Sequence, residues 1–300
     1  GSAGSVTATF PVERGEVYAV SSLSGLKRAT RVGPELNEGL SNGRGSADWV
    51  VVTTAPLVTA ASELASYRQA QGLTTMVVDA EAIYDEFGDG LRTPKAIRAF
   101  LGFAMSKWRS RPKHVLLAGA GDLDFKGRYG LGGNDLPPIM ISTPAGILAS
   151  DNALADLDGD GAPDLSIGRL PVRTAAELRA YIEKVRAYES PSLQGVPERV
   201  LLVADNQEDG VDFSADADAF GSAMPSGWTT EKQYLDAAPF QTTRAGVLAG
   251  WNSGASAVAY YGHGGFDRLA AEGLLTSNDI GGLASATPPI LTGLSCFIGR

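Results

Sequence analysis

The stretch Ser256-Ala-Val-Ala-Tyr-Tyr-Gly-His-Gly-Gly265 places an apolar run directly before a histidine that is flanked by glycines. A second apolar run, residues 289–294, leads in the same way to Cys296, the one cysteine of the chain. Such runs are typical of buried strands in parallel sheets. Because parallel strands of one sheet end at the same edge, we expect His263 and Cys296 to lie together at that edge.

Strand and helix patterns alternate along the chain from residue 49 to residue 294. Apolar runs predict strands at residues 49–53, 75–79, 114–118, 165–167, 200–204, 229–234, 256–261 and 290–294. Helical spacing predicts helices at residues 58–71, 94–108, 213–224, 242–251 and 277–283, and one more after the capping box of Thr174 and Glu177. The alternation predicts an α/β fold with two adjacent doubly wound units and mainly parallel sheets.

The length of 300 residues suits two domains. Residues 1–46 form a lead-in or the end of a preceding region, residues 47–190 the first unit, and residues 191–300 the second. Residues 123–163 are expected to be a long irregular excursion. Because a strand that presents a nucleophile normally leads into a helix, we also expect the part of the second unit after Cys296 to be incomplete.

The composition restricts the classes of partner. The 34 acidic and 25 basic residues give a net charge of −9 without a basic stripe for phosphates, so we expect no nucleic-acid partner. One cysteine rules out an internal disulfide framework. No run of about 18 apolar residues exists, so we expect no transmembrane segment. The oligomeric state is left open.

Cys296 and His263 suit nucleophilic catalysis. A thiolate at Cys296 would attack a carbonyl carbon, His263 would transfer the proton, and the N–H of Gly264 would hold the oxyanion. The plainer interpretation makes Cys296 a small buried hydrophobic residue. Glycine on both sides of His263 favours an exposed turn with a close backbone approach, and therefore favours catalysis.

Several motifs, in a fixed order, resemble one family of peptidases. They are residues 47–53, 115–119 with Asp122, 150–152, 156–164, 167–171, 184–189, 261–264 and 294–296. Each is similar to a block of the gingipain-type cysteine peptidases of the caspase/legumain clan, and the likeness covers roughly residues 47–300. The residues around Cys296 differ from the Gln-Ala-Cys-Arg-Gly of caspases.

This resemblance implies two caspase-like subdomains, with the Cys296/His263 pair in the second. It implies a bacterial endopeptidase, secreted or exposed at the cell surface, that cleaves protein or peptide substrates through a thioester acyl-enzyme. The family includes members directed to Arg and Lys, so a basic residue before the cleaved bond is the expected preference.

An acidic loop in the first unit has the composition of a cation site. Its carboxylates, separated by tight-turn glycines, belong to Asp156, Asp158, Asp160 and Asp164. Oxygen ligands at this spacing predict a structural Ca²⁺ site, although Ile167 at the twelfth position excludes the helix–loop–helix version. A solvated acidic turn is the alternative. Asp164 also matches, by the resemblance, the acid that orients the catalytic histidine, but the loop spacing favours the metal.

A function from a different class remains as the alternative. The chain could be a non-catalytic, calcium-stabilised surface or adhesion module that keeps the peptidase fold. Reactivity of the thiol separates the two functions, because a catalytic cysteine reacts as its thiolate and a buried structural cysteine reacts slowly.

Overall fold

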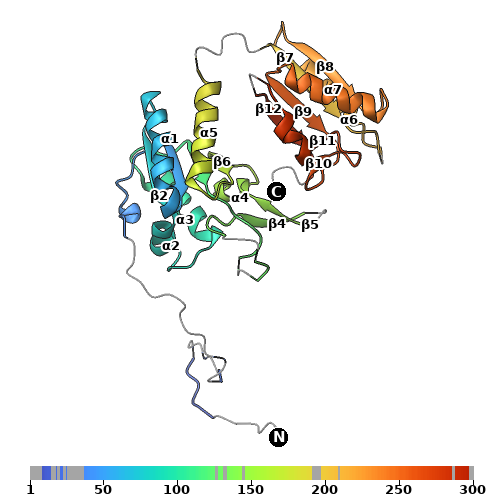
Figure 1. Cartoon of the computed structure of the whole chain (residues 1–300). Coiled ribbons are helices and arrows are strands. Elements are labelled where there is room, and N and C mark those ends of the chain that lie inside the picture. The colour runs from blue at the N-terminus through green and yellow to red at the C-terminus, as the bar shows by residue number, and fades with distance from the viewer. Residues whose placement is uncertain are drawn as a thin grey trace. The chain divides into compact units, whose positions relative to one another are not determined.

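The computed structural model describes residues 9–14, 18, 21–22, 25, 37–125, 128–130, 134–143, 146–190, 197–208, 210–285 and 288–296. The chain divides into two compact units, residues 1–171 and 172–300, each with its own four-stranded sheet (Figure 1). The division falls before α5 (Ala175–Tyr188), a helix that the sequence pattern assigns to the first unit. Most of residues 1–36 and residues 191–196 lie outside the described residues.

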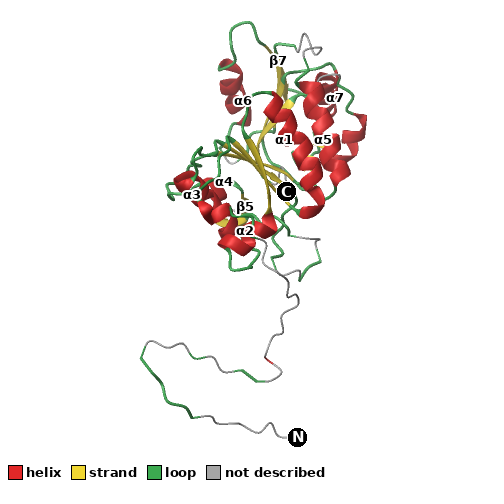
Figure 2. Ribbon diagram, turned by 90° about the vertical axis from the view of Figure 1, so that its left-hand side faces the viewer, coloured by secondary structure: helices red, strands yellow, loops and turns green. Residues whose placement is uncertain are grey.

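The first sheet is parallel and covered on both faces. Its order is β2-β1-β3-β6, with β1 (Trp49–Thr53), β2 (Thr75–Asp79), β3 (His114–Ala118) and β6 (Ser166–Leu170). Its helices are α1 (Val58–Ala70), α2 (Ala80–Phe87), α3 (Pro94–Lys107) and α4 (Asn152–Ala155). Val50 and Val52 pack with α2 and α3, whereas Val51 is buried on the other face, where α1 lies (Figure 2). Alternate side chains of β1 thus pack against helices on opposite faces of the sheet.

The second sheet repeats this arrangement. Its order is β12-β9-β7-β8, all parallel, with β7 (Arg199–Ala204), β8 (Thr229–Tyr234), β9 (Ala257–Tyr261) and β12 (Ile290–Leu294). On one face Val200 and Leu202 share a core with Ala217 of α6 (Phe213–Ser222). On the other face Leu201 and Val203 pack with α7 (Phe240–Asn252). The expected α/β fold with doubly wound, mainly parallel sheets is therefore confirmed.

Short elements complete the two units. In the second, β10 (Arg268–Leu269) pairs antiparallel with β11 (Leu275–Thr276), and the 3-10 helix η4 (Ser277–Gly282) follows. In the first, the 3-10 helices are η2 (Leu40–Asn42) and η3 (Ala55–Leu57). Leu40 is buried in the first core, so residues ahead of position 47 take part in that unit. Among the described helices, none combines the length and apolar character needed to cross a bilayer.

The sequence pattern predicted most strands but missed several elements. Residues 49–53, 75–79, 114–118, 229–234 and 290–294 form strands with the expected bounds. The expectation of an irregular excursion over 123–163 is wrong, because it contains a hairpin of β4 (Ile139–Thr143) and β5 (Gly146–Ser150) and then α4. Helix α2 was also missed, because no loop separates it from β2: Asp79 ends the strand and its carboxylate caps the helix through the N–H of Glu81.

Candidate functional site

His263 and Cys296 follow two neighbouring strands of the second sheet. Strands β9 and β12 pair in parallel, and their last paired residues are Tyr261 and Leu294. His263 and Cys296 each lie two residues beyond that last pair. Because the two strands are parallel, both residues leave the sheet at the same carboxyl edge, as the sequence predicted. Neighbouring strands are about 4.8 Å apart, so the two chain segments emerge side by side.

The turn after His263 lies directly against the turn that carries Cys296. A Cβ atom on Gly264 would collide with the carbonyl oxygen of Cys296 and with Oγ of Ser295. Gly262, at φ +152°, likewise leaves no room for a side chain beside Asp205. Both positions therefore require glycine, Gly264 because of a neighbouring backbone turn and Gly262 because of neighbouring side chains. The cysteine itself is exposed and free, so a ligand can reach its thiol.

Three side chains contact His263, one from the first residue of α6 and two from the β7–α6 connection. The first residue of that connection, Asp205, is 3% exposed, and Oδ2 of its carboxylate accepts the backbone N–H of His263 at 3.0 Å. Oε2 of Glu208 lies 3.2 Å from Nε2 of the imidazole. The ring of Phe213 meets the imidazole edge to face, with centroids 5.4 Å apart. The backbone position and the ring orientation of His263 are therefore set by separate side chains.

Sequence reasoning missed these three neighbours. Asp205 had a usable signal, because it directly follows an apolar strand at the same carboxyl edge of the sheet. Glu208 lies farther along the connection and Phe213 begins α6, and only the folded backbone brings the two to the histidine. The carboxylate of Glu208 and the imidazole of His263 are each more than half exposed, so water screens this pair in the free protein.

The acidic loop of the first unit gathers three of its four predicted ligands. Carboxylate oxygens of Asp156, Asp158 and Asp164 lie within 4.8 Å of one another. Asp160 is outside this group, and its Oδ1 accepts the N–H of Ala162 at 2.8 Å. Like charges this close repel each other, and a divalent cation would relieve the repulsion.

Asp164 also has a local structural partner. Its Oδ2 accepts the N–H of Leu157 at 2.7 Å, which closes the acidic loop. The carboxylate that lies against the imidazole of His263 is that of Glu208. The role of Asp164 in orienting the histidine stays a prediction. Glu177 forms the expected capping box with Thr174 at the start of α5, which explains its presence.

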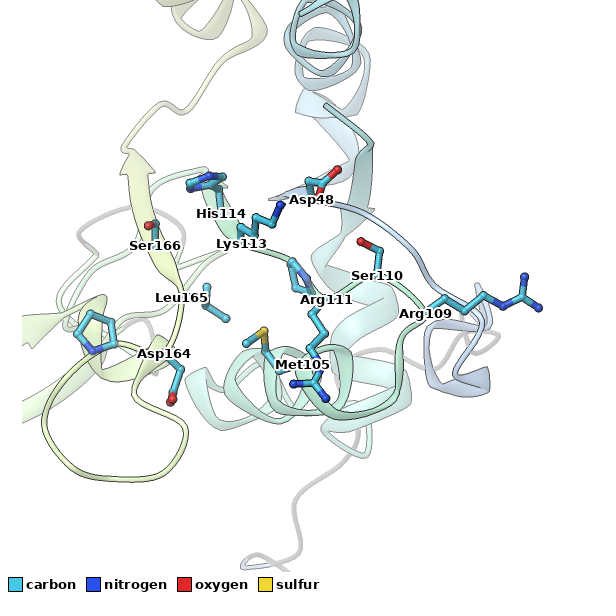
Figure 3. Close-up of a pocket in the computed structure, with 12 residues that line it drawn as sticks. Asp48, Met105, Arg109, Ser110, Arg111, Lys113, His114, Asp164, Leu165 and Ser166 are labelled. Atoms are coloured by element: carbon cyan, nitrogen blue, oxygen red, sulfur yellow. Dashed lines mark ion pairs between the residues drawn. The ribbon is translucent and has the colours of Figure 1, made fainter. Parts of the chain in front are cut away.

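A cavity of about 760 Å³ lies at the amino edge of the first sheet, where β1, β3 and β6 begin (Figure 3). Its lining includes Asp48, His114 and Ser166, and Lys113 pairs with Asp48 at 3.4 Å. In open α/β sheets ligands bind at the carboxyl ends of the strands, whereas this cavity is at the amino ends. The candidate site is therefore the edge that carries His263 and Cys296.

Comparison with known proteins bears on the fold and the family of the chain. No curated protein matches the chain at a significant level. The structure of the complex of Porphyromonas gingivalis RgpB pro- and mature domains is similar at a TM-score of 0.67 and 20% identity, over 84% of this chain and 56% of that one. The Arg specific cysteine proteinase gingipain R (RGPB) gives a TM-score of 0.65 and 19% identity, over 89% of this chain and 57% of that one.

A third structure, described only as a protease, gives a TM-score of 0.58 and 21% identity, over 83% of this chain and 52% of that one. At these identities the likeness establishes the fold, and the chain spans little more than half the length of the structures it matches. The model of peptidase family C25 matches residues 43–300. The chain therefore belongs to peptidase family C25, a family of cysteine peptidases.

Proposed function

We propose that this chain carries the catalytic site of an endopeptidase in which Cys296 and His263 hydrolyse peptide bonds. One observation carries the proposal: the register of β9 and β12 brings the single cysteine and a glycine-flanked histidine to one sheet edge. Membership of a cysteine peptidase family supports the assignment of the thiol as the nucleophile.

The proposed reaction has two steps. His263 accepts the thiol proton, the sulfur of Cys296 attacks the carbonyl carbon, and the C–N bond breaks as His263 protonates the leaving amine. The thioester that remains is hydrolysed by a water molecule, whose proton passes through His263 and returns to the thiol. The N–H groups of Gly264 and Cys296 are suited to hold the oxyanion, since neither donates to an acceptor among the described residues.

We assign the orienting role to Glu208. A carboxylate on Nε2 fixes the imidazole ring and stabilises the imidazolium that forms in the reaction. The exposed pair is weak in the free protein, and a bound peptide that excludes water would strengthen it. Asp164 is then left to the acidic loop of the first unit.

We also propose that this loop binds a structural Ca²⁺. Asp156, Asp158 and Asp164 supply oxygen ligands, and Asp160, two positions from Asp158, would complete the set. The backbone turns with φ of +84° at Gly159 and +92° at Gly161, conformations that suit glycine in a tight cation loop.

The expected substrates are proteins or peptides cleaved after Arg or Lys, and the expected location is outside a bacterial cell or on its surface. The likeness to an Arg specific proteinase supports the preference.

Cleavage of a panel of fluorogenic peptides tests the proposal. Each peptide carries Arg, Lys or a neutral residue before the reporter. The protein should cleave at least the basic peptides, and Cys296→Ala and His263→Ala should abolish cleavage. His114→Ala is the matched control, because it removes the other histidine and should leave activity unchanged. Failure of the unmodified protein to cleave any peptide would refute the enzymatic function and favour a non-catalytic surface module.

A further inference from the structure

Tyr260 of β9 places a buried hydroxyl beneath the candidate active site. The residue is 0% exposed and its ring packs in the core beside α7. The hydroxyl donates to the carbonyl oxygen of His263 at 2.5 Å and accepts the N–H of Ala270 at 2.8 Å. The N–H of Ala270 also donates directly to the carbonyl oxygen of His263, with 2.8 Å between nitrogen and oxygen. One side chain therefore connects the two ends of residues 263–270, which we call the His263 loop.

The His263 loop is closed by few other contacts. The N–H of Gly265 donates to the carbonyl oxygen of Arg268 at 2.9 Å, and Gly264 forms a bridge with Leu269. Ala270 ends the loop at φ +58°, a conformation that is unfavourable for a residue with a side chain. Such a residue persists only where its surroundings hold it in place, and the hydroxyl of Tyr260 is one of the groups that bond it.

The chemistry of the hydroxyl suits a permanent structural bond. Burial and the nearby carboxylate of Asp205 raise the pKa of Tyr260 well above its usual value, so the hydroxyl keeps its proton. Asp205 holds the N–H of His263 from the β7 side, whereas Tyr260 holds its carbonyl oxygen from below. The peptide groups on both sides of His263 are therefore fixed by buried side chains.

We infer that Tyr260 is a positioning residue for catalysis. Its hydroxyl keeps the His263 loop closed, and the closed loop holds the imidazole of His263 and the N–H of Gly264 against the turn of Cys296. This inference rests on the proposed function. Without the hydroxyl, the ends of the loop keep only the direct bond from the N–H of Ala270 to the carbonyl oxygen of His263, and they lose the buried group that ties both to β9. Groups that must act within tenths of an ångström then lose their alignment.

The test compares Tyr260→Phe with Tyr261→Phe. The first change removes only the hydroxyl and keeps the ring that packs in the core. The second is a matched control on the next residue of β9, whose hydroxyl makes no hydrogen bond with the described part of the chain. We expect Tyr260→Phe to lower kcat about 10-fold or more while KM changes less than about twofold. Tyr261→Phe should keep both constants within about twofold of the unmodified protein.

Hydrogen exchange gives a readout that does not need activity. Amides of residues 263–270 should exchange faster in Tyr260→Phe than in Tyr261→Phe, and those of β7 should be unchanged. Unchanged exchange in the His263 loop would overturn the inference, as would an active Tyr260→Phe variant with an unaltered kcat or with the loss confined to KM. If the unmodified protein cleaves no peptide, the proposed function fails, and exchange alone decides whether Tyr260 holds the loop.

Discussion

Oε2 of Glu208 lies 3.2 Å from Nε2 of His263, although the two residues come from different connections of the second sheet. Glu208 follows β7, and His263 follows β9, the neighbouring strand. The contact directs the imidazole toward the β7–α6 connection at the edge where the cysteine is exposed, although water screens the pair in the free protein. Glu208 belongs to none of the sequence motifs, and this contact makes it a target for mutation.

Glu208→Gln should lower kcat about 10-fold or more with a smaller change in KM, because an amide no longer stabilises the imidazolium. Steady-state kinetics on the basic fluorogenic peptides measure both constants. Glu198→Gln is the control, since it removes an exposed carboxylate at the other end of β7. Equal kinetics for the two variants would show that Glu208 does not orient the histidine.

Gly264→Ala should reduce kcat about 100-fold, because the added methyl group collides with the carbonyl oxygen of Cys296 and separates the two turns. Gly281→Ala provides the control, since a Cβ there meets open space. Thermal melting of both variants shows whether each protein still folds. A folded Gly264→Ala protein with normal kcat would contradict the close approach of the turns.

Removal of Ca²⁺ should loosen the first unit locally. A cation at about 100 times its Kd stabilises a folded state by about 2.7 kcal/mol, so chelation should speed hydrogen exchange in residues 150–170 and leave β7 and β9 unchanged. Asp158→Asn should abolish the response to Ca²⁺, whereas Asp89→Asn, an exposed change outside the loop, should keep it. If hydrogen exchange in residues 150–170 is the same with Ca²⁺ and with chelator, the acidic loop does not bind the metal.

Asp279 should make the second unit sensitive to acid. Hydrogen bonds from Arg244, at 2.6 and 3.0 Å, and from Thr276 lower the pKa of Asp279 to about 2. A lowered pKa in the folded state adds stability above the ordinary value of 3.8, and this stability is lost as the pH falls toward 2. Asp279→Asn should therefore lower Tm at pH 7, and its Tm should approach that of the unmodified protein as the pH falls below about 4.

Melting curves from about pH 7 to pH 2.5 measure this effect. Asp267→Asn is the comparison, because the carboxylate of Asp267 forms an exposed ion pair with its neighbour Arg268, so the change should have a small effect. A Tm difference for Asp279→Asn that does not vary with pH would contradict the assignment.

The sequence predicts the strands of both sheets because buried parallel strands are continuous apolar runs that stand out locally. The same logic predicts that His263 and Cys296 follow neighbouring strands at one edge, since parallel strands end on the same side of a sheet. The hairpin of β4 and β5 escapes prediction because its side chains are only partly buried and show no clear alternation. Such a hairpin leaves little hydrophobic pattern in the sequence.

The parts of the site that escape prediction depend on tertiary structure. Glu208 and Phe213 are ordinary loop and helix residues until β7 and β9 pair and bring their connections together. Tyr260 looks like any large apolar residue of a buried strand, and only the folded His263 loop gives its hydroxyl two partners. In both cases the decisive contact joins segments whose spacing in the sequence carries no signal.

The central claim is that the thiol of Cys296 and the imidazole of His263 act together. Iodoacetamide modification of Cys296 at about pH 6, followed by intact-mass measurement, tests it directly, because only a thiolate reacts quickly. We expect rapid modification of the unmodified protein and of His114→Ala, and modification at least about 10-fold slower in His263→Ala. Equal rates in all three proteins would contradict the claim.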